Sequence, residues 1–171
     1  SKNRWLTEKE IGSGMEFTER RALGFHIPGK FDKVLDIDQC HLQPEPSNQI
    51  RNFVRRYAIG HGLEFFDMVG KQGFLRNMII RNNLAGEFMI ILSFFREEKD
   101  HMEELMTDLQ TSFPMITSLW YSVNPKANDT LEGLDVVLFS GKDHIEECME
   151  NLRFRISPKS FFQTNTIQAC R

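Results

Sequence analysis

The sequence has few cysteines and lacks any long hydrophobic run. Its three cysteines, Cys40, Cys148 and Cys170, are an odd number without metal-ligand spacing. This usage indicates a reducing compartment rather than a disulfide framework. No apolar stretch reaches the length of a membrane span, and no secretory signal pattern is present. The sequence therefore predicts a cytoplasmic protein with no membrane partner.

The sequence also lacks the short motifs that identify several enzyme classes. It contains no glycine-rich phosphate-binding loop, no metal-ligand cluster and no Ser-His-Asp arrangement. Its five histidines are scattered, and a lone histidine more often has a structural role than a catalytic one. The net charge of −3 gives no general sign of nucleic-acid binding. Any RNA-binding surface would have to be a local patch.

The composition and periodicity are those of a globular domain. The 171 residues are 40% hydrophobic and 26% charged, enough for one domain with a substantial core. Helical periods predict two main helices, at 47–60 and 98–112. Hairpin-like strand pairs together with these two helices favour a single-domain α+β fold with an antiparallel-dominated sheet. The predicted strands are 20–27, 31–37, 74–82, 87–95, 116–123, 135–140, 144–149 and 152–156.

The first predicted helix is amphipathic. Ser47 is in a position to cap its N-terminus. Arg51, Arg55 and Arg56 fall on or beside the face opposite its apolar stripe. We favour a solvated face for these arginines, and the alternative is a ridge that contacts phosphates. The apolar positions of the second helix are Met102, Leu105, Met106 and Leu109.

The C-terminal stretch combines a strand with a polar turn. In residues 152–156, apolar side chains alternate with arginines, which predicts a strand with one buried face. Pro158 then ends the strand, because proline has no amide hydrogen for the ladder. Asn165 and Gln168 have the spacing of a capping box, which predicts a helix from about residue 166.

These signals divide the chain into three parts. Residues 1–19 are polar without a clear period and predict a poorly ordered N-terminal arm. Residues 20–165 form the predicted central α+β domain, and residues 166–171 the start of a helix leading into a further domain. Because the sequence does not begin with methionine, we expect a piece of a longer protein.

Two motifs give the sequence a specific resemblance. Residues 154–165 read F-R-I-S-P-K-S-F-F-Q-T-N. This stretch resembles the F-x-I-S-P-x-S-F-F-Q-x-N signature of bacterial RNA uridine C5-methyltransferases. Those enzymes use S-adenosylmethionine to make 5-methyluridine in ribosomal or transfer RNA. Residues 24–42, with Gly24-Phe25 and then D-Q-C-H-L at 38–42, are similar to the family's G-F-x…D-x-C-x-L segment.

The resemblance implies roles for three residues. Phe161 matches the aromatic residue that packs against the target uracil, and the alternative is a core phenylalanine. Gln163 matches a glutamine at the cofactor, and the alternative is a cap or turn amide. Cys40 matches the fourth ligand of a 4Fe-4S cluster found in many members. The alternative for Cys40 is a small buried hydrophobic residue.

Several functional groups of the family have no match in this chain. The nucleophilic cysteine and the glutamate base are expected after Gln163, and the amino-terminal RNA-binding barrel and the other three cluster cysteines are also unmatched. The resemblance therefore implies a central RNA-recognition domain that is inactive alone and holds neither S-adenosylmethionine nor a cluster alone. Cys40 favours ribosomal over transfer RNA as the substrate. The alternative function is a non-catalytic α+β module that binds RNA or senses a ligand.

Overall fold

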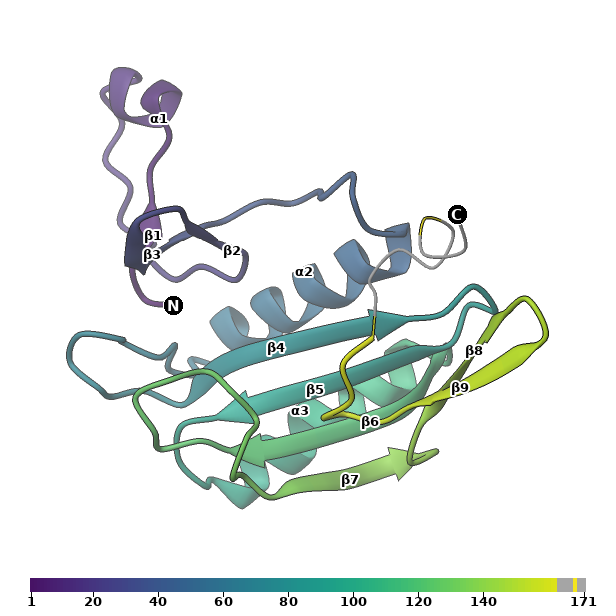
Figure 1. Ribbon diagram of the computed structural model, residues 1–171. Coiled ribbons are helices and arrows are strands. Elements are labelled where there is room, and N and C mark those ends of the chain that lie inside the picture. Colours follow the sequence, from purple (N-terminus) through teal and green to yellow (C-terminus); the bar gives the residue numbers. More distant parts are fainter. Residues whose placement is uncertain (163–167, 169–171) are drawn as a thin grey trace. The chain divides into compact units, whose positions relative to one another are not determined.

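The computed structural model describes residues 1–162 and residue 168 (Figure 1). The chain divides into two compact units, Ser1–Arg76 and Asn77–Arg171, which are described separately below. Within the described residues, no helix combines the length and apolar character needed to cross a bilayer. The helix predicted from about residue 166 lies outside the part of the chain that the structure describes.

The first unit contains a small three-stranded sheet. Its strand order is β1-β3-β2, with β1 parallel and β2 antiparallel to β3. Residues 1–19, predicted to be a poorly ordered arm, contain β1 and the short helix α1. A capping box between Thr7 and Glu10 begins that helix. The elements are β1 (Arg4–Trp5), α1 (Glu8–Gly12), β2 (Phe25–Ile27), β3 (Lys30–Leu35) and α2 (Glu45–Gly60).

Helix α2 begins earlier than its sequence predicts. Ser47 does not cap it: the cap is Pro44, and Ser47 is buried inside the first turn. Pro46 is tolerated there because the first amides of a helix have no intrahelical acceptor. The helix ends at Gly60 as predicted, and Gly62 follows in a left-handed conformation with φ of 67°.

The second unit is built on a mixed four-stranded sheet of order β4-β5-β6-β7 (Figure 1). Strands β5 and β6 are parallel because helix α3 forms the crossover between them, whereas β6 and β7 are antiparallel. The α+β class with two main helices and mostly antiparallel strands is thus confirmed. The elements are β4 (Leu75–Asn82), β5 (Phe88–Phe94), α3 (Lys99–Ser112), β6 (Ile116–Val123) and β7 (Val136–Gly141).

Strand β5 is the centre of this unit. All seven of its residues are buried, which accounts for its nearly continuous apolar sequence F-M-I-I-L-S-F. Helix α3 contacts β6 and buries the four apolar positions predicted for it. Met89 and Ile91 of β5 belong to a separate apolar cluster with Leu131, Leu134 and Ile156. This cluster joins the sheet to the loop after β6 and to the end of the chain.

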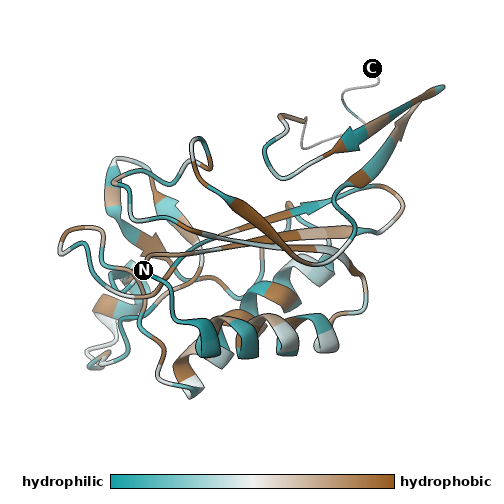
Figure 2. Ribbon diagram, turned by 90° about the horizontal axis from the view of Figure 1, so that it is seen from below, coloured by the Kyte–Doolittle hydropathy of each residue, from teal (hydrophilic) through white to brown (hydrophobic). Residues whose placement is uncertain are grey.

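Strands β8 (Ile145–Met149) and β9 (Leu152–Ile156) form a two-stranded sheet of their own. They do not complete the larger sheet, as the sequence predicted, and β9 does not have one buried face. Leu152 is 62% exposed and Phe154 38%, whereas Ile156 is 3% exposed. Figure 2 shows this hairpin extending away from the rest of the unit. A two-stranded ribbon without a covering layer can bury side chains only at its base.

Polar contacts hold the base of the hairpin to the turn between β4 and β5. The Asn83 side-chain amide donates to the Glu146 carbonyl over 2.7 Å. The buried Glu147 carboxylate accepts from the Leu84 amide over 3.1 Å. These bonds satisfy polar groups that burial would otherwise penalise. The hairpin therefore has a fixed base and an exposed tip.

The burial gradient along β9 gives a direct stability prediction. Ile156→Ala should lower the free energy of unfolding by about 2–4 kcal/mol, because it opens a cavity in the apolar cluster. Leu152→Ala, four residues away on the same strand, is the matched control and should cost less than about 1 kcal/mol. Urea denaturation of both variants measures the difference. Equal losses would contradict the burial gradient.

Candidate functional site

The site predicted from the sequence lies at a tight corner after β9. The Ser160 amide donates to the Ser157 carbonyl over 3.1 Å, and the two serine hydroxyls lie 2.7 Å apart. The Ser157 amide also donates to the Ser160 hydroxyl over 3.1 Å. Pro158 occupies the second position of this turn, where its fixed φ is favourable. The residues S-P-K-S thus close a rigid turn immediately before Phe161.

Arg81 on β4 donates hydrogen bonds to the backbone of this corner. Its guanidinium Nη1 donates to the Ser160 carbonyl over 2.6 Å and, more weakly, to the Ser157 carbonyl over 3.5 Å. None of the ion pairs among the described residues involves Arg81. Burial lowers the pKa of its guanidinium, with no carboxylate to oppose that effect. No sequence pattern identifies Arg81, because its partners are backbone carbonyls 76 and 79 positions away.

The two consecutive phenylalanines take opposite environments. Phe161 is 87% exposed. Phe162 is half-buried and packs against the apolar cluster of the sheet, with its ring centroid 6.0 Å from that of Phe154. The structure therefore places Phe161 outward and Phe162 inward. Its contact with a uracil stays a prediction, and Gln163 lies outside the described residues.

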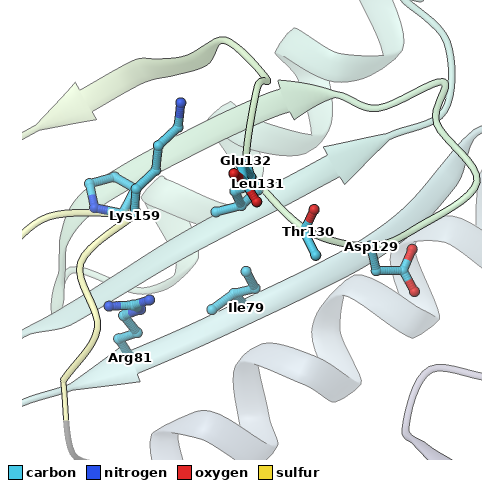
Figure 3. Close-up of a pocket in the computed structure, with 8 residues that line it drawn as sticks. Ile79, Arg81, Asp129, Thr130, Leu131, Glu132 and Lys159 are labelled. Carbon is cyan, nitrogen blue, oxygen red and sulfur yellow. The ribbon is translucent and has the colours of Figure 1, made fainter.

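A pocket of about 500 Å³ adjoins the corner (Figure 3). It lies between β4, the loop that follows β6, and the turn itself. Lys159, at the variable position of the signature, donates from Nζ to the Leu134 carbonyl over 2.6 Å. The volume falls in the range of small-ligand sites. The lining residues are Ile79, Arg81, Asp129, Thr130, Leu131, Glu132, Pro158 and Lys159.

Cys40 lies in the first unit, after β3. It is a half-buried free thiol, and its backbone is paired with the side chain of Asn48 on α2. The Cys40 amide donates to Asn48 Oδ1 over 2.8 Å. In the part of the chain that the structure describes, no three His, Cys, Asp or Glu side chains gather as a metal site. Cys148 is exposed on β8, and Cys170 lies outside the described residues.

The arginines of α2 do not form one face. Arg51 is 4% exposed, and its Nη2 donates to the carbonyls of Ile37 and Asp38 over 3.1 and 3.0 Å. Arg55 pairs with Asp36 over 2.8 Å and also with Asp38, and it holds the pKa of Asp38 low through that hydrogen bond. The predicted solvated face is therefore wrong for Arg51 and Arg55, and so is the phosphate ridge. Arg56 is exposed.

Comparison with known proteins places this site in a context. No protein-family model matches the sequence. The chain is 49% identical to a protein of Bacteroides thetaiotaomicron named an uncharacterized RNA methyltransferase, over 99% of this chain and 38% of the relative. A protein of the same name from Porphyromonas gingivalis is 44% identical, over 99% of this chain and 37% of its own length. The chain thus spans little more than a third of these relatives.

A solved structure resembles the chain in fold. It is the tRNA (uracil-54, C5)-methyltransferase of Pyrococcus abyssi in complex with S-adenosyl-L-homocysteine. The TM-score is 0.69 with 27% identity, over 86% of this chain and 35% of that one. The chain is therefore similar in sequence to part of RNA methyltransferases and in structure to part of a uracil-C5 methyltransferase.

The contact of Arg81 with the corner predicts a local effect of its removal. Arg81→Ala should lower the free energy of unfolding by about 1–3 kcal/mol, the scale of a charge-assisted hydrogen bond. Amide hydrogen exchange at residues 157–161 should accelerate in the same variant. Arg153→Ala, which removes an exposed arginine from β9, should shift stability by less than about 0.5 kcal/mol. Unchanged exchange in the corner of Arg81→Ala would show that this guanidinium does not hold it.

The exposure of Phe161 and the packing of Phe162 predict different effects of their removal on thermal stability. Phe161→Ala should leave the melting temperature of the 171-residue chain within about 2 °C of the parent, because the ring is exposed. Phe162→Ala should lower it by several degrees, since it removes packing from the apolar cluster. Calorimetric melts of both variants make the comparison. A large loss for Phe161→Ala would favour the plain core interpretation of that residue.

Proposed function

We propose that the chain is the central, RNA-recognising part of an S-adenosylmethionine-dependent RNA (uracil-C5)-methyltransferase that makes 5-methyluridine. The observation that carries this proposal is the corner at residues 157–162. Its sequence matches the signature of such enzymes, and it exposes Phe161 in a chain whose fold is similar to part of one of them. The identities of 49% and 44% to proteins named RNA methyltransferases support the same class.

In this proposal Phe161 forms one wall of the uridine site. A base that undergoes chemistry leaves its stack and needs a new stacking partner, which an exposed aromatic ring provides. The turn and Arg81 fix the backbone that carries this ring. Fixing it in advance reduces the entropy cost of ordering the site when RNA binds.

The cofactors require groups beyond the described residues. Gln163 is the one residue proposed to contact S-adenosylmethionine, and a single amide does not make a site for that ligand. Cys40 is proposed as one ligand of a 4Fe-4S cluster in the longer protein, and one cysteine of four cannot hold it. The described part of the chain therefore does not by itself fit either group.

The resemblance implies that a cysteine thiolate elsewhere in the longer protein would add to uracil C6 and that C5 would take a methyl group from S-adenosylmethionine. A base would then remove the C5 proton, and the thiolate would leave C6. The thiolate and the base have no counterpart in this sequence. The proposed role of this chain is to hold RNA and to place the uridine against Phe161. Ribosomal RNA is the proposed substrate class, because Cys40 stands at the cluster position; transfer RNA, the substrate named for the P. abyssi protein, is the competing class.

The full-length protein tests this function. It should incorporate labelled methyl groups from S-adenosylmethionine into RNA isolated from a strain that lacks its gene. Digestion and mass spectrometry should identify 5-methyluridine, and separate assays with ribosomal and transfer RNA should identify the substrate. Binding of RNA without any 5-methyluridine would instead support a non-catalytic RNA-binding module. The 171-residue chain alone should show no micromolar binding of S-adenosylmethionine in calorimetry.

The stacking role of Phe161 predicts a kinetic defect without unfolding. In the full-length protein, Phe161→Ala should lower kcat/KM by about 5- to 150-fold, equivalent to the 1–3 kcal/mol of one base–aromatic stack. Phe161→Trp should retain most of the activity, because it keeps an aromatic face. Steady-state methylation kinetics measure both. If alanine and tryptophan were equally active, stacking by Phe161 would be rejected.

A further inference from the structure

The pocket beside the corner has a cationic end. Arg81 and Lys159 line it from β4 and from the turn, respectively (Figure 3). Their side chains donate to the carbonyls of Ser160 and Leu134, and within the described residues neither forms an ion pair. A carbonyl satisfies a hydrogen bond but does not neutralise a charge. Two cations without carboxylate partners at one cavity favour an anionic ligand group.

The rest of the pocket differs in chemistry from this end. Ile79 and Leu131 form an apolar floor in the middle, and Thr130 and Asp129 lie at the opposite end (Figure 3). The carboxylate of Glu132, from the same loop as Asp129, lies beside Leu131, between Lys159 and Thr130 (Figure 3). A carboxylate can only accept hydrogen bonds, so it suits the N–H donors of a base edge. A nucleotide offers a matching phosphate anion, the flat face of a base and the N–H donors of the base edge.

We propose that this pocket holds one nucleotide of a single-stranded RNA, with its phosphate at Arg81 and Lys159 and its base edge toward Asp129. This inference rests on the proposed function, which makes RNA the source of the nucleotide. Lys159 and Phe161 are two residues apart in the corner, so the bound nucleotide is a near neighbour of the target uridine. Unpaired bases offer their edges for such recognition. Guanine is the preferred base, because N1–H and N2–H donate side by side.

A titration of the 171-residue chain tests the site directly. GMP should shift the NMR signals of Ile79 and Leu131, whereas inorganic phosphate and guanosine, each offering part of the ligand, should bind more weakly. UMP should also bind more weakly than GMP. Phosphate binding as tightly as GMP would reduce the pocket to an anion site and overturn the nucleotide assignment. So would GMP-dependent shifts confined to residues outside the pocket.

Variants separate the two ends of the pocket. Lys159→Gln should weaken GMP binding by about three- to fivefold, the scale of one partly exposed ion pair. Asp129→Asn should reduce the preference for GMP over UMP, because it replaces a pure acceptor by a donor and acceptor. Lys99→Gln, on α3 and outside this pocket, is the charge-matched control and should change neither. Equal effects of Lys159→Gln and Lys99→Gln would overturn the proposal.

Kinetics of the full-length protein separate this inference from the proposed function. Lys159→Gln should raise KM for RNA while leaving kcat unchanged, because the contact is equal in ground and transition states. Uridine methylation together with no nucleotide binding at this pocket would reject the inference alone. Nucleotide binding here without uridine methylation would reject the proposed function and leave the pocket as a nucleotide site.

Discussion

Burial of strand β5 on both faces is the constraint on which the second unit depends. A strand of seven buried residues needs a covering layer on each side of the sheet. Helix α3 contacts β6 and covers one side of the sheet. On the other side, Met89 and Ile91 pack in an apolar cluster with residues from the loop after β6 and from the end of the chain. That second cover is irregular. Irregular backbone over a sheet leaves a pocket where its side chains do not meet, and the corner that carries the signature borders it.

The same constraint separates the two phenylalanines. Phe162 packs against the apolar cluster, whereas Phe161, the preceding residue, is exposed. Packing of Phe162 thus leaves the Phe161 ring in solvent, and removal of that ring would leave the core intact.

Each unit uses an arginine to hold an irregular segment, and Arg51 is buried whereas Arg81 is half-buried. Arg51 donates to the carbonyls of Ile37 and Asp38, just before Cys40, and Arg81 donates to the carbonyls of the S-P-K-S turn. Each arginine comes from a regular element and fixes a stretch that carries one of the two family motifs. Backbone carbonyls that would otherwise be unsatisfied gain a charged donor. The arrangement leaves Arg81 at the pocket without an ion pair among the described residues.

The sequence by itself determined the α+β class, the apolar face of α3, the ends of most strands and the position of the corner after β9. These features depend on local periodicity and on short motifs. It did not determine that the β8–β9 hairpin leaves the sheet, since Leu152 and Ile156 alternate identically whether or not a layer covers them. Nor could it distinguish a solvated arginine from one that hydrogen-bonds to distant backbone. Arg51 donates to carbonyls 13 and 14 residues away, and Arg81 donates to carbonyls almost 80 residues away. Burial and hydrogen bonding to distant backbone are properties of the assembled chain, and only the tertiary structure decided them.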